Sequence, residues 1–152
     1  MRTLEVRRHA KRDPAADRLS EAGRAQAEDV GRSLVETYDV VFVSPAQRAA
    51  ETVAWMLRGR GAQLPPHAVV PGLAAHDNDG SPLAMAGVLS GLVDAVPDDG
   101  RGLAISHTPL IERGVLGLLA RDIEPLSECE GVVLTKRDDD SAVELEGELR
   151  LR

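Results

Sequence analysis

The chain has 152 residues, of which 43% are hydrophobic and 28% are charged, a composition typical of one soluble folded domain. Its net charge of −7 and its 2% aromatic residues argue against a general nucleic-acid binder, since such proteins need a basic face and stacking side chains. No apolar stretch approaches the roughly 20 residues of a membrane span, and the first residues do not lead into an apolar signal core. We therefore expect a cytoplasmic protein that does not bind membranes.

The first predicted element is a strand over Thr3–Val6, which leads into Arg7, Arg8 and His9. In open α/β sheets, ligand chemistry gathers where strands end and loops begin. A neutral imidazole is a nucleophile, and neighbouring guanidinium groups keep it neutral by lowering its pKa. The same groups can hold a phosphoryl group by paired hydrogen bonds. Taken alone, three such residues are more typical of a solvated basic strand end, so the interpretation depends on a second arginine and a second histidine.

A polar loop over residues 11–18 follows this strand and is long enough to fold over its end. Ser20 is a predicted N-cap, and Glu21 suits the first turn of a helix. Apolar residues continue the helical period to about Tyr38.

A second buried strand is predicted over residues 39–44, because a continuous apolar run ends there at Pro45. A helix over residues 46–58 follows directly. This strand-to-helix turn places Arg48 near the carboxyl end of the second strand. We therefore expect Arg48 and His9 at the same edge of the sheet.

Residues 67–70 read as a short strand, residues 71–82 as irregular chain and residues 83–96 as an apolar helix. A further buried strand over residues 102–105 ends at His107. Pro109 suits the first position of the helix that continues over residues 110–120. His107 thus repeats the position of His9, at the end of a buried strand.

The last part of the chain alternates apolar and polar residues and predicts an antiparallel hairpin. Its strands are expected over residues 132–135 and from residue 142 onward toward the terminus. The expected architecture is one domain, residues 1–152, with three α/β/α layers. A mostly parallel sheet has helices on both faces and this antiparallel hairpin at its edge.

The strand-end residues and their surroundings resemble the histidine phosphatase superfamily, which has the phosphoglycerate-mutase-like fold. Residues 8–10 (RHA) match the Arg-His-Gly or Arg-His-Ala that follows the first strand in that family. Residues 19–27 (LSEAGRAQA) match its Leu-Thr-x-x-Gly-x-x-Gln-Ala pattern, and residues 44–52 (SPAQRAAET) match Ser-Pro-x-x-Arg-Ala-x-x-Thr. Ser106-His107 stands where the family has Gly-His, with serine in place of glycine. The short chain and the Asp17-Arg18-Leu19 run are most similar to the small SixA-like phosphohistidine phosphatases.

This resemblance implies a phosphatase in which His9 attacks phosphorus and forms a covalent phosphohistidine that water then hydrolyses. Arg8, Arg48 and His107 would surround the transferring oxygens, so that no metal or other cofactor is required. The implied partner is a phosphorylated protein or a small phosphorylated molecule, and we expect a monomer. The basic residues of the first loop either contact this substrate or only shape the rim of the site: Lys11, Arg12 and Arg18.

The sequence departs from the family at the general acid. Larger members supply a carboxylate from the segment after the third strand, where this chain offers Asp77 as first candidate and His76 as second. A phosphohistidine substrate makes this gap less serious, because a protonated imidazole leaves more easily than an alkoxide. Two functions remain: a phosphatase acting on phosphohistidine or small phosphomonoesters, and a catalytically weak relative that binds a phosphorylated partner in the same pocket.

Overall fold

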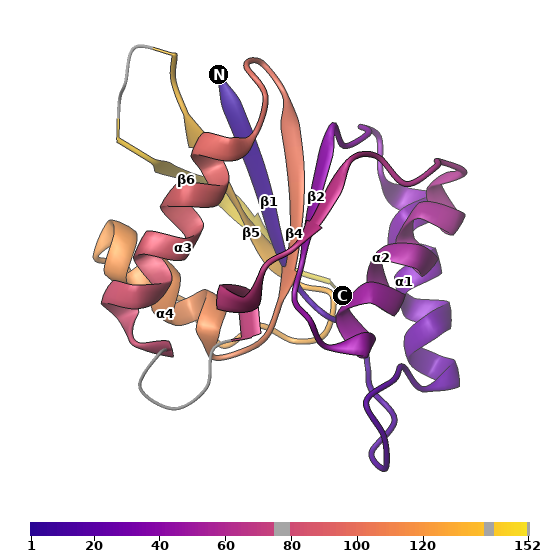
Figure 1. Cartoon of the computed structure of the whole chain (residues 1–152). Helices are drawn as coiled ribbons and strands as arrows, with labels where there is room; N and C mark the ends of the chain where they lie inside the picture. The colour runs from indigo at the N-terminus through magenta and orange to yellow at the C-terminus, as the bar shows by residue number, and fades with distance from the viewer. Residues whose placement is uncertain (75–79, 139–141, 152) are drawn as a thin grey trace.

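The computed structural model describes residues 1–74, 80–138 and 142–151. Its centre is a six-stranded sheet with the strand order β3-β2-β4-β1-β5-β6 (Figure 1). The four strands from β3 to β1 run parallel, whereas β5 is antiparallel to β1 and β6 is antiparallel to β5. The predicted mostly parallel sheet with an antiparallel hairpin at its edge is confirmed. The strands are β1 (Arg2–Arg8), β2 (Val40–Val43), β3 (His67–Val69), β4 (Arg101–Ser106), β5 (Gly131–Lys136) and β6 (Glu144–Leu149).

The helices cover the two faces of the sheet in pairs (Figure 1). α1 (Glu21–Ser33) and α2 (Gln47–Arg60) pack together on one face, and α3 (Pro82–Ala95) and α4 (Leu110–Leu119) pack on the other. A short 3₁₀ helix, η1 (Pro71–Ala74), follows β3. Each face has its own buried apolar cluster, which explains why the central strands read as continuous apolar runs.

The parallel strands end at the same edge of the sheet. Arg8 at the end of β1 is in register with Ser106 at the end of β4. Val43 at the end of β2 is likewise in register with Ile105 of β4. The residues that follow these strands are therefore neighbours in space, as ligand sites of open α/β sheets require.

The first helix is shorter than predicted. α1 ends at Ser33, Leu34 has extended backbone, and Val35 is 87% exposed. The chain leaves the helix because Tyr38 turns inward, where its hydroxyl donates to Glu5 Oε1 of β1 at 2.8 Å. Helical periodicity alone could not reveal this competing polar contact.

The other predicted boundaries need small corrections. Pro109 is the N-cap of α4 rather than its first helical residue, and β6 stops at Leu149 instead of continuing to the terminus. None of the helices in the described part of the chain is long and apolar enough to cross a membrane.

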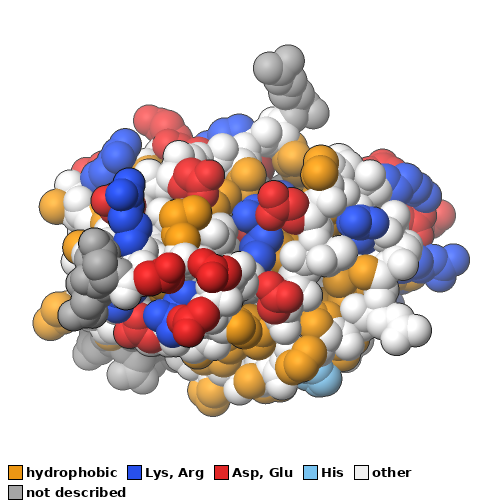
Figure 2. Space-filling view, turned by 90° about the horizontal axis from the view of Figure 1, so that it is seen from above, with side chains coloured by type: hydrophobic (Ala, Val, Ile, Leu, Met, Phe, Trp, Pro, Cys, Tyr) orange, Lys and Arg blue, Asp and Glu red, His pale blue; other side chains and the backbone are white. Residues whose placement is uncertain are grey.

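Acidic and basic side chains lie beside one another at the opposite edge of the sheet, where the parallel strands begin (Figure 2). Arg2 pairs there with Asp98, and Arg101 pairs with Glu5 and Glu36. In each of these pairs the charge is thus matched by a neighbour of opposite sign.

Candidate active site

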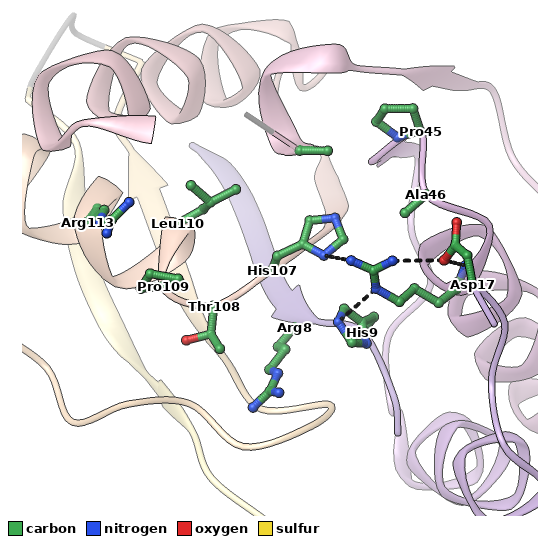
Figure 3. Close-up of a pocket in the computed structure, with 12 residues that line it drawn as sticks. Arg8, His9, Asp17, Pro45, Ala46, His107, Thr108, Pro109, Leu110 and Arg113 are labelled. Atoms are coloured by element: carbon green, nitrogen blue, oxygen red, sulfur yellow. Dashed lines mark hydrogen bonds and ion pairs between the residues drawn. The ribbon is translucent and has the colours of Figure 1, made fainter. Parts of the chain in front are cut away.

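The four residues predicted from the sequence, Arg8, His9, Arg48 and His107, line one hollow at the carboxyl edge of the parallel strands (Figure 3). Its volume is about 570 Å³, which leaves room for a phosphoryl group and for part of the group that carries it. The other residues lining it are Asp17, Pro45, Ala46, Ala74, Thr108, Pro109, Leu110 and Arg113.

Arg48 lies at the centre of this arrangement. Its Nε donates to His9 Nε2 at 3.3 Å, and its Nη2 donates to His107 Nδ1 at 3.2 Å. Its Nη1 contacts Asp17 Oδ1 at 2.8 Å. The two imidazole ring centroids are 5.2 Å apart, so one guanidinium group joins both histidines (Figure 3).

The contacts of His9 assign its tautomer. Nδ1 lies 2.7 Å from the carbonyl oxygen of Ala10, which can only accept, so Nδ1 carries the proton. The lone pair is then on Nε2, where it accepts from Arg48. Burial lowers the pKa of His9; the bond to Ala10 opposes this shift, and the charges of Arg48, Arg8 and Arg12 add to it. His9 is therefore a neutral imidazole with a nucleophilic Nε2.

His107 has the opposite tautomer. Its Nδ1 accepts from Arg48, because a guanidinium group can only donate. Its Nε2 therefore carries the proton and donates to Ser44 Oγ at 2.7 Å. Burial, followed by the charge of Arg48, lowers the pKa of His107 to about 4.

The Arg8 side chain is turned toward the loop that precedes β5. Its Nη1 donates to the carbonyl oxygen of Leu126 at 2.8 Å, and its Nη2 lies 3.3 Å from Glu128 Oε2. Its buried Nε has no hydrogen-bond partner among the described residues. Arg8 also lines a second hollow, together with His9, Lys11, Arg12, Pro14, Arg48 and Glu128.

The segment 44–52 places three polar side chains around the site. Arg48 and Thr52 are four residues apart on α2 and share one face of that helix. Thr52 Oγ1 accepts from the backbone N–H of Ala10 at 2.9 Å. Ala10 directly follows His9, the residue that Arg48 contacts. Ser44, at the end of β2, holds His107. The spacing of this motif is therefore explained by three contacts with two strand ends.

The segment 19–27 fixes the turn after His9. Ser20 caps α1 by accepting from Gly23 N–H at 3.0 Å, and its own N–H donates to the Lys11 carbonyl at 3.0 Å. A Cβ atom at Gly23 would lie 1.9 Å from that same carbonyl oxygen, so only glycine fits there. Gln26 Oε1 accepts from Lys11 N–H at 3.3 Å. α1 thus holds the backbone two residues beyond the nucleophile.

Asp17 is a site residue that the sequence does not reveal, although the Asp17-Arg18-Leu19 run resembles the SixA-like proteins. Its carboxylate accepts from Gln47 N–H at 2.9 Å and from Arg48 N–H at 3.2 Å, in addition to Arg48 Nη1. It thereby caps α2, whose own N-cap residue is Ala46. Burial acts to raise the pKa of Asp17, but the bonds from Gln47 and Arg48 outweigh it and lower that pKa.

The remaining predicted residues have different outcomes. Lys11 lines the second hollow. Arg18 lies at neither hollow, because its Nε donates to Asp13 Oδ2 at 3.0 Å. Asp77 and His76 lie outside the described residues.

Two further features of the site were not anticipated. Arg113 lines the first hollow from α4. In the sequence it follows His107 by fewer than two helical turns, and this short spacing is the signal that could have indicated it. Ser106, which replaces the family glycine, is buried and donates to the Leu73 carbonyl at 2.6 Å. No three histidine, cysteine or carboxylate side chains within the described ranges form a metal-binding group.

Comparison with known proteins gives three findings. A model of the histidine phosphatase superfamily (branch 1) matches residues 4–74, the segment that carries Arg8, His9 and Arg48. None of the curated proteins matches the chain. Several solved structures share its fold over nearly the whole length.

One similar structure is the protein histidine phosphatase SixA complexed with tungstate, at 21% identity and a TM-score of 0.76, covering 97% of this chain and 96% of that one. Another is the putative phosphohistidine phosphatase SixA from Agrobacterium tumefaciens, at 17% identity and a TM-score of 0.71, covering 99% of this chain and 98% of that one. A third is a phosphoserine phosphatase from Entamoeba histolytica in complex with 3-phosphoglyceric acid, at 16% identity and a TM-score of 0.75. The similarity covers 100% of this chain and 98% of that one.

At these identities the similarity to solved structures establishes the phosphoglycerate-mutase-like fold. The family match adds the motifs around His9 and Arg48, which the structure brings into one hollow with His107. Residues 4–74 therefore match the histidine phosphatase superfamily (branch 1), and the whole chain has the phosphoglycerate-mutase-like fold.

Proposed function

We propose that the protein hydrolyses phosphohistidine on a protein, without a metal ion, through a covalent phosphohistidine formed on His9. The match of residues 4–74 to the superfamily supports phosphatase activity in general terms. The observation that carries the proposal is the single Arg48 guanidinium between two neutral imidazoles, with the lone pair of His9 on Nε2.

In the first step, His9 Nε2 forms a bond to phosphorus as the P–N bond of the substrate breaks. The electron pair of that bond returns to the substrate imidazole, which leaves as neutral imidazole if its other nitrogen already carries a proton. In the second step, a water oxygen attacks phosphorus and the bond to Nε2 breaks. Nε2 regains its lone pair, inorganic phosphate forms, and the proton lost by water passes to phosphate or solvent.

The cationic groups stabilise the charge that spreads over the phosphoryl oxygens in a loose transition state. Arg48 already holds its donors between the two histidines, and Arg8 contributes at the rim of the same hollow. A doubly negative phosphoryl group next to His107 raises the pKa of that imidazole from about 4 and favours its protonation. Protonation places a hydrogen on Nδ1 of His107, which then donates to a phosphoryl oxygen instead of accepting from Arg48 Nη2.

The acid chemistry of the described part of the site favours phosphohistidine over an alkyl phosphate ester. Asp17 is the one carboxylate among the described residues that line the first hollow, and it is bound to Arg48. The low pKa of Asp17 keeps it ionised, so it is a poor proton donor at neutral pH. An alkoxide leaving group needs such a donor, whereas protonated phosphohistidine does not.

The proposal is tested by measuring kcat/KM on a phosphohistidine-carrying peptide and on para-nitrophenyl phosphate, each with wild-type protein and the His9→Ala variant. We expect the wild type to prefer the phosphohistidine peptide and His9→Ala to lose turnover of both. Preference for the aryl phosphate would assign the site to small phosphomonoesters. Tight binding of the peptide without any His9-dependent turnover would instead assign it to binding alone.

A further inference from the structure

The second hollow has a volume of about 610 Å³ and shares Arg8, His9 and Arg48 with the first. Its other wall consists of Lys11, Arg12 and Pro14 from the first loop, with Glu128 opposite. The nucleophile therefore lies at the junction of two open hollows rather than at the bottom of one closed pocket. A substrate that carries its phosphoryl group between them can extend in both directions.

The wall that carries Lys11 and Arg12 is held in place by backbone contacts. Arg12 pairs with Leu19 in an antiparallel bridge, and Asp13 N–H donates to the Arg18 carbonyl at 2.7 Å. These contacts form a narrow hairpin that projects beyond the carboxyl ends of the parallel strands (Figure 1). Lys11 is fixed against α1 by Ser20 and Gln26, as described above. The backbone that carries the two cations therefore has little freedom left to lose on binding.

The two cations on this wall are available to a ligand. Both side chains are exposed. Within the described residues, the Lys11 ammonium group forms no hydrogen bond or ion pair. Arg12 donates only to the carbonyl oxygens of Asp13 and Ala16, at 3.2 and 3.3 Å. Its charge also acts to lower the pKa of His9, so it lies close enough to affect the nucleophile.

The charge of the second hollow contrasts with that of the protein. Four of its lining residues are cationic, Arg8, Lys11, Arg12 and Arg48, and one is anionic, Glu128. The whole chain has a net charge of −7. Arg8 and Arg48 are engaged by the phosphoryl site and its ion pairs, so Lys11 and Arg12 are the cations left over for other groups.

We propose that the second hollow is a binding subsite for carboxylate side chains that flank the phosphohistidine of a protein substrate. This inference deepens the proposed function, on which it rests. Lys11 and Arg12 would select protein substrates that have acidic residues beside the phosphorylated histidine. The first hollow, on the other side of His9, would bind the residues on the opposite flank of that histidine. The two cations would contribute to binding of the protein substrate and not to the chemical step, since neither is one of the four residues proposed to surround phosphorus.

The test uses two phosphohistidine peptides of equal length, one with aspartate and glutamate around the phosphorylated histidine and one with serine and glutamine. The readout is the ratio of their kcat/KM values, because any effect of a substitution on His9 itself cancels in that ratio. We expect the wild type to prefer the acidic peptide about tenfold at low salt, with the difference mainly in KM. The Lys11→Ser/Arg12→Ser variant should reduce this ratio to near one.

The matched control is Arg121→Ser/Arg137→Ser, which removes the same charge from exposed positions that line neither hollow. It should keep the wild-type ratio of kcat/KM values. An equal fall of this ratio in both double variants would show that the acidic peptide is attracted by the net charge of the protein, and would overturn the subsite. Equal rates on both peptides in the wild type would also overturn it. A single-stranded oligonucleotide that inhibits more strongly than the unphosphorylated acidic peptide would assign the hollow to phosphodiesters.

A second assay separates this proposal from the proposed function. The unphosphorylated acidic peptide should inhibit hydrolysis of para-nitrophenyl phosphate competitively in the wild type and about tenfold more weakly in Lys11→Ser/Arg12→Ser. Suppose that neither phosphohistidine peptide is hydrolysed, but that the acidic peptide inhibits the wild type and inhibits Lys11→Ser/Arg12→Ser more weakly. The phosphohistidine function then fails and the subsite stands. If the peptides are hydrolysed without any charge preference or inhibition, only the subsite fails.

Discussion

Arg48 provides a different nitrogen to each of three neighbours: Nε to His9, Nη2 to His107 and Nη1 to Asp17. At the residue scale, this division of donors is what distinguishes the site from a patch of positive charge. A planar guanidinium group can make such contacts in several directions at once, whereas an ammonium group is a point charge on a flexible stem.

We therefore expect Arg48→Lys to retain the charge but lose the geometry, and to lower kcat by about 100-fold or more. The melting temperature should change by only a few degrees, because the Arg48 side chain lines the hollow and is not part of the apolar core. Thermal unfolding and steady-state kinetics on the same preparation test this. A loss of stability that matches the loss of turnover would make Arg48 a structural residue.

Asp17 acts through Arg48 and is a positioning residue. Replacing Asp17 by Ala removes the cap of α2 and the Nη1 contact, and should cost about 1 kcal/mol of stability and about tenfold in kcat. Adding Ala46→Ser supplies a local cap and should restore stability without restoring kcat. Asp13→Asn, in the same hairpin but remote from Arg48, is the control. Recovery of kcat together with stability would show that Asp17 serves only the helix.

His107 makes stability depend on pH. Its pKa is about 4 in the folded protein and about 6.5 when unperturbed, so the unfolded state binds the proton more readily between these values. Stability is therefore lost as pH falls through this window, by about 2 kcal/mol between pH 7 and 4.5 for this residue. Urea unfolding of wild type and His107→Gln at both pH values measures it. An identical pH dependence in the two proteins would contradict the depressed pKa.

At the scale of secondary-structure elements, the catalytic loop is held mainly by α1 and α2. The motif on α2 contacts the backbone after β1 through Thr52, and the motif on α1 contacts it through Ser20, Gly23 and Gln26. The close approach at Gly23 is the most sensitive of these contacts, because its neighbour is a backbone atom that cannot rotate away.

Gly23→Ala places a methyl group where the Lys11 carbonyl oxygen lies, and should destabilise the protein by about 1–3 kcal/mol while lowering turnover. Gly91→Ala on α3 is the matched control, since no atom lies within 4 Å of its added Cβ. It should instead stabilise the protein by about 0.5–1 kcal/mol, because alanine has the higher helix propensity. Denaturant unfolding compares the two variants. Equal effects would mean that the Lys11 turn adapts freely.

The elements were predictable where local pattern and packing agree. Buried runs such as residues 39–44 and the Ser20 cap gave the strands and the start of α1 almost at their observed positions. The end of α1 was not predictable, since it depends on Tyr38 reaching Glu5 across the fold. Arg8, His9, Arg48 and His107 could be found because parallel strands bring their ends together. Asp17 could not, because its role depends on the helix that it caps.

At the scale of the whole molecule, the two edges of the sheet differ in chemistry. At the amino edge acidic and basic side chains lie beside one another (Figure 2). One ion pair there joins Arg2 and Asp98. The carboxyl edge gathers two imidazoles and several guanidinium groups around two hollows in a protein of net negative charge. Negative phosphoryl groups are therefore attracted to this edge of a molecule whose net charge is negative.

The central claim is that His9 accepts the phosphoryl group. It is tested most directly by mixing the protein with a labile phosphodonor, quenching in base, where phosphohistidine survives, and locating the added phosphate by peptide mass spectrometry. We expect phosphate on His9 in the wild type, more of it in variants that hydrolyse the intermediate slowly, and none in His9→Ala. Turnover of substrate by His9→Ala at the wild-type rate, or phosphate trapped on His107 instead of His9, would contradict the account.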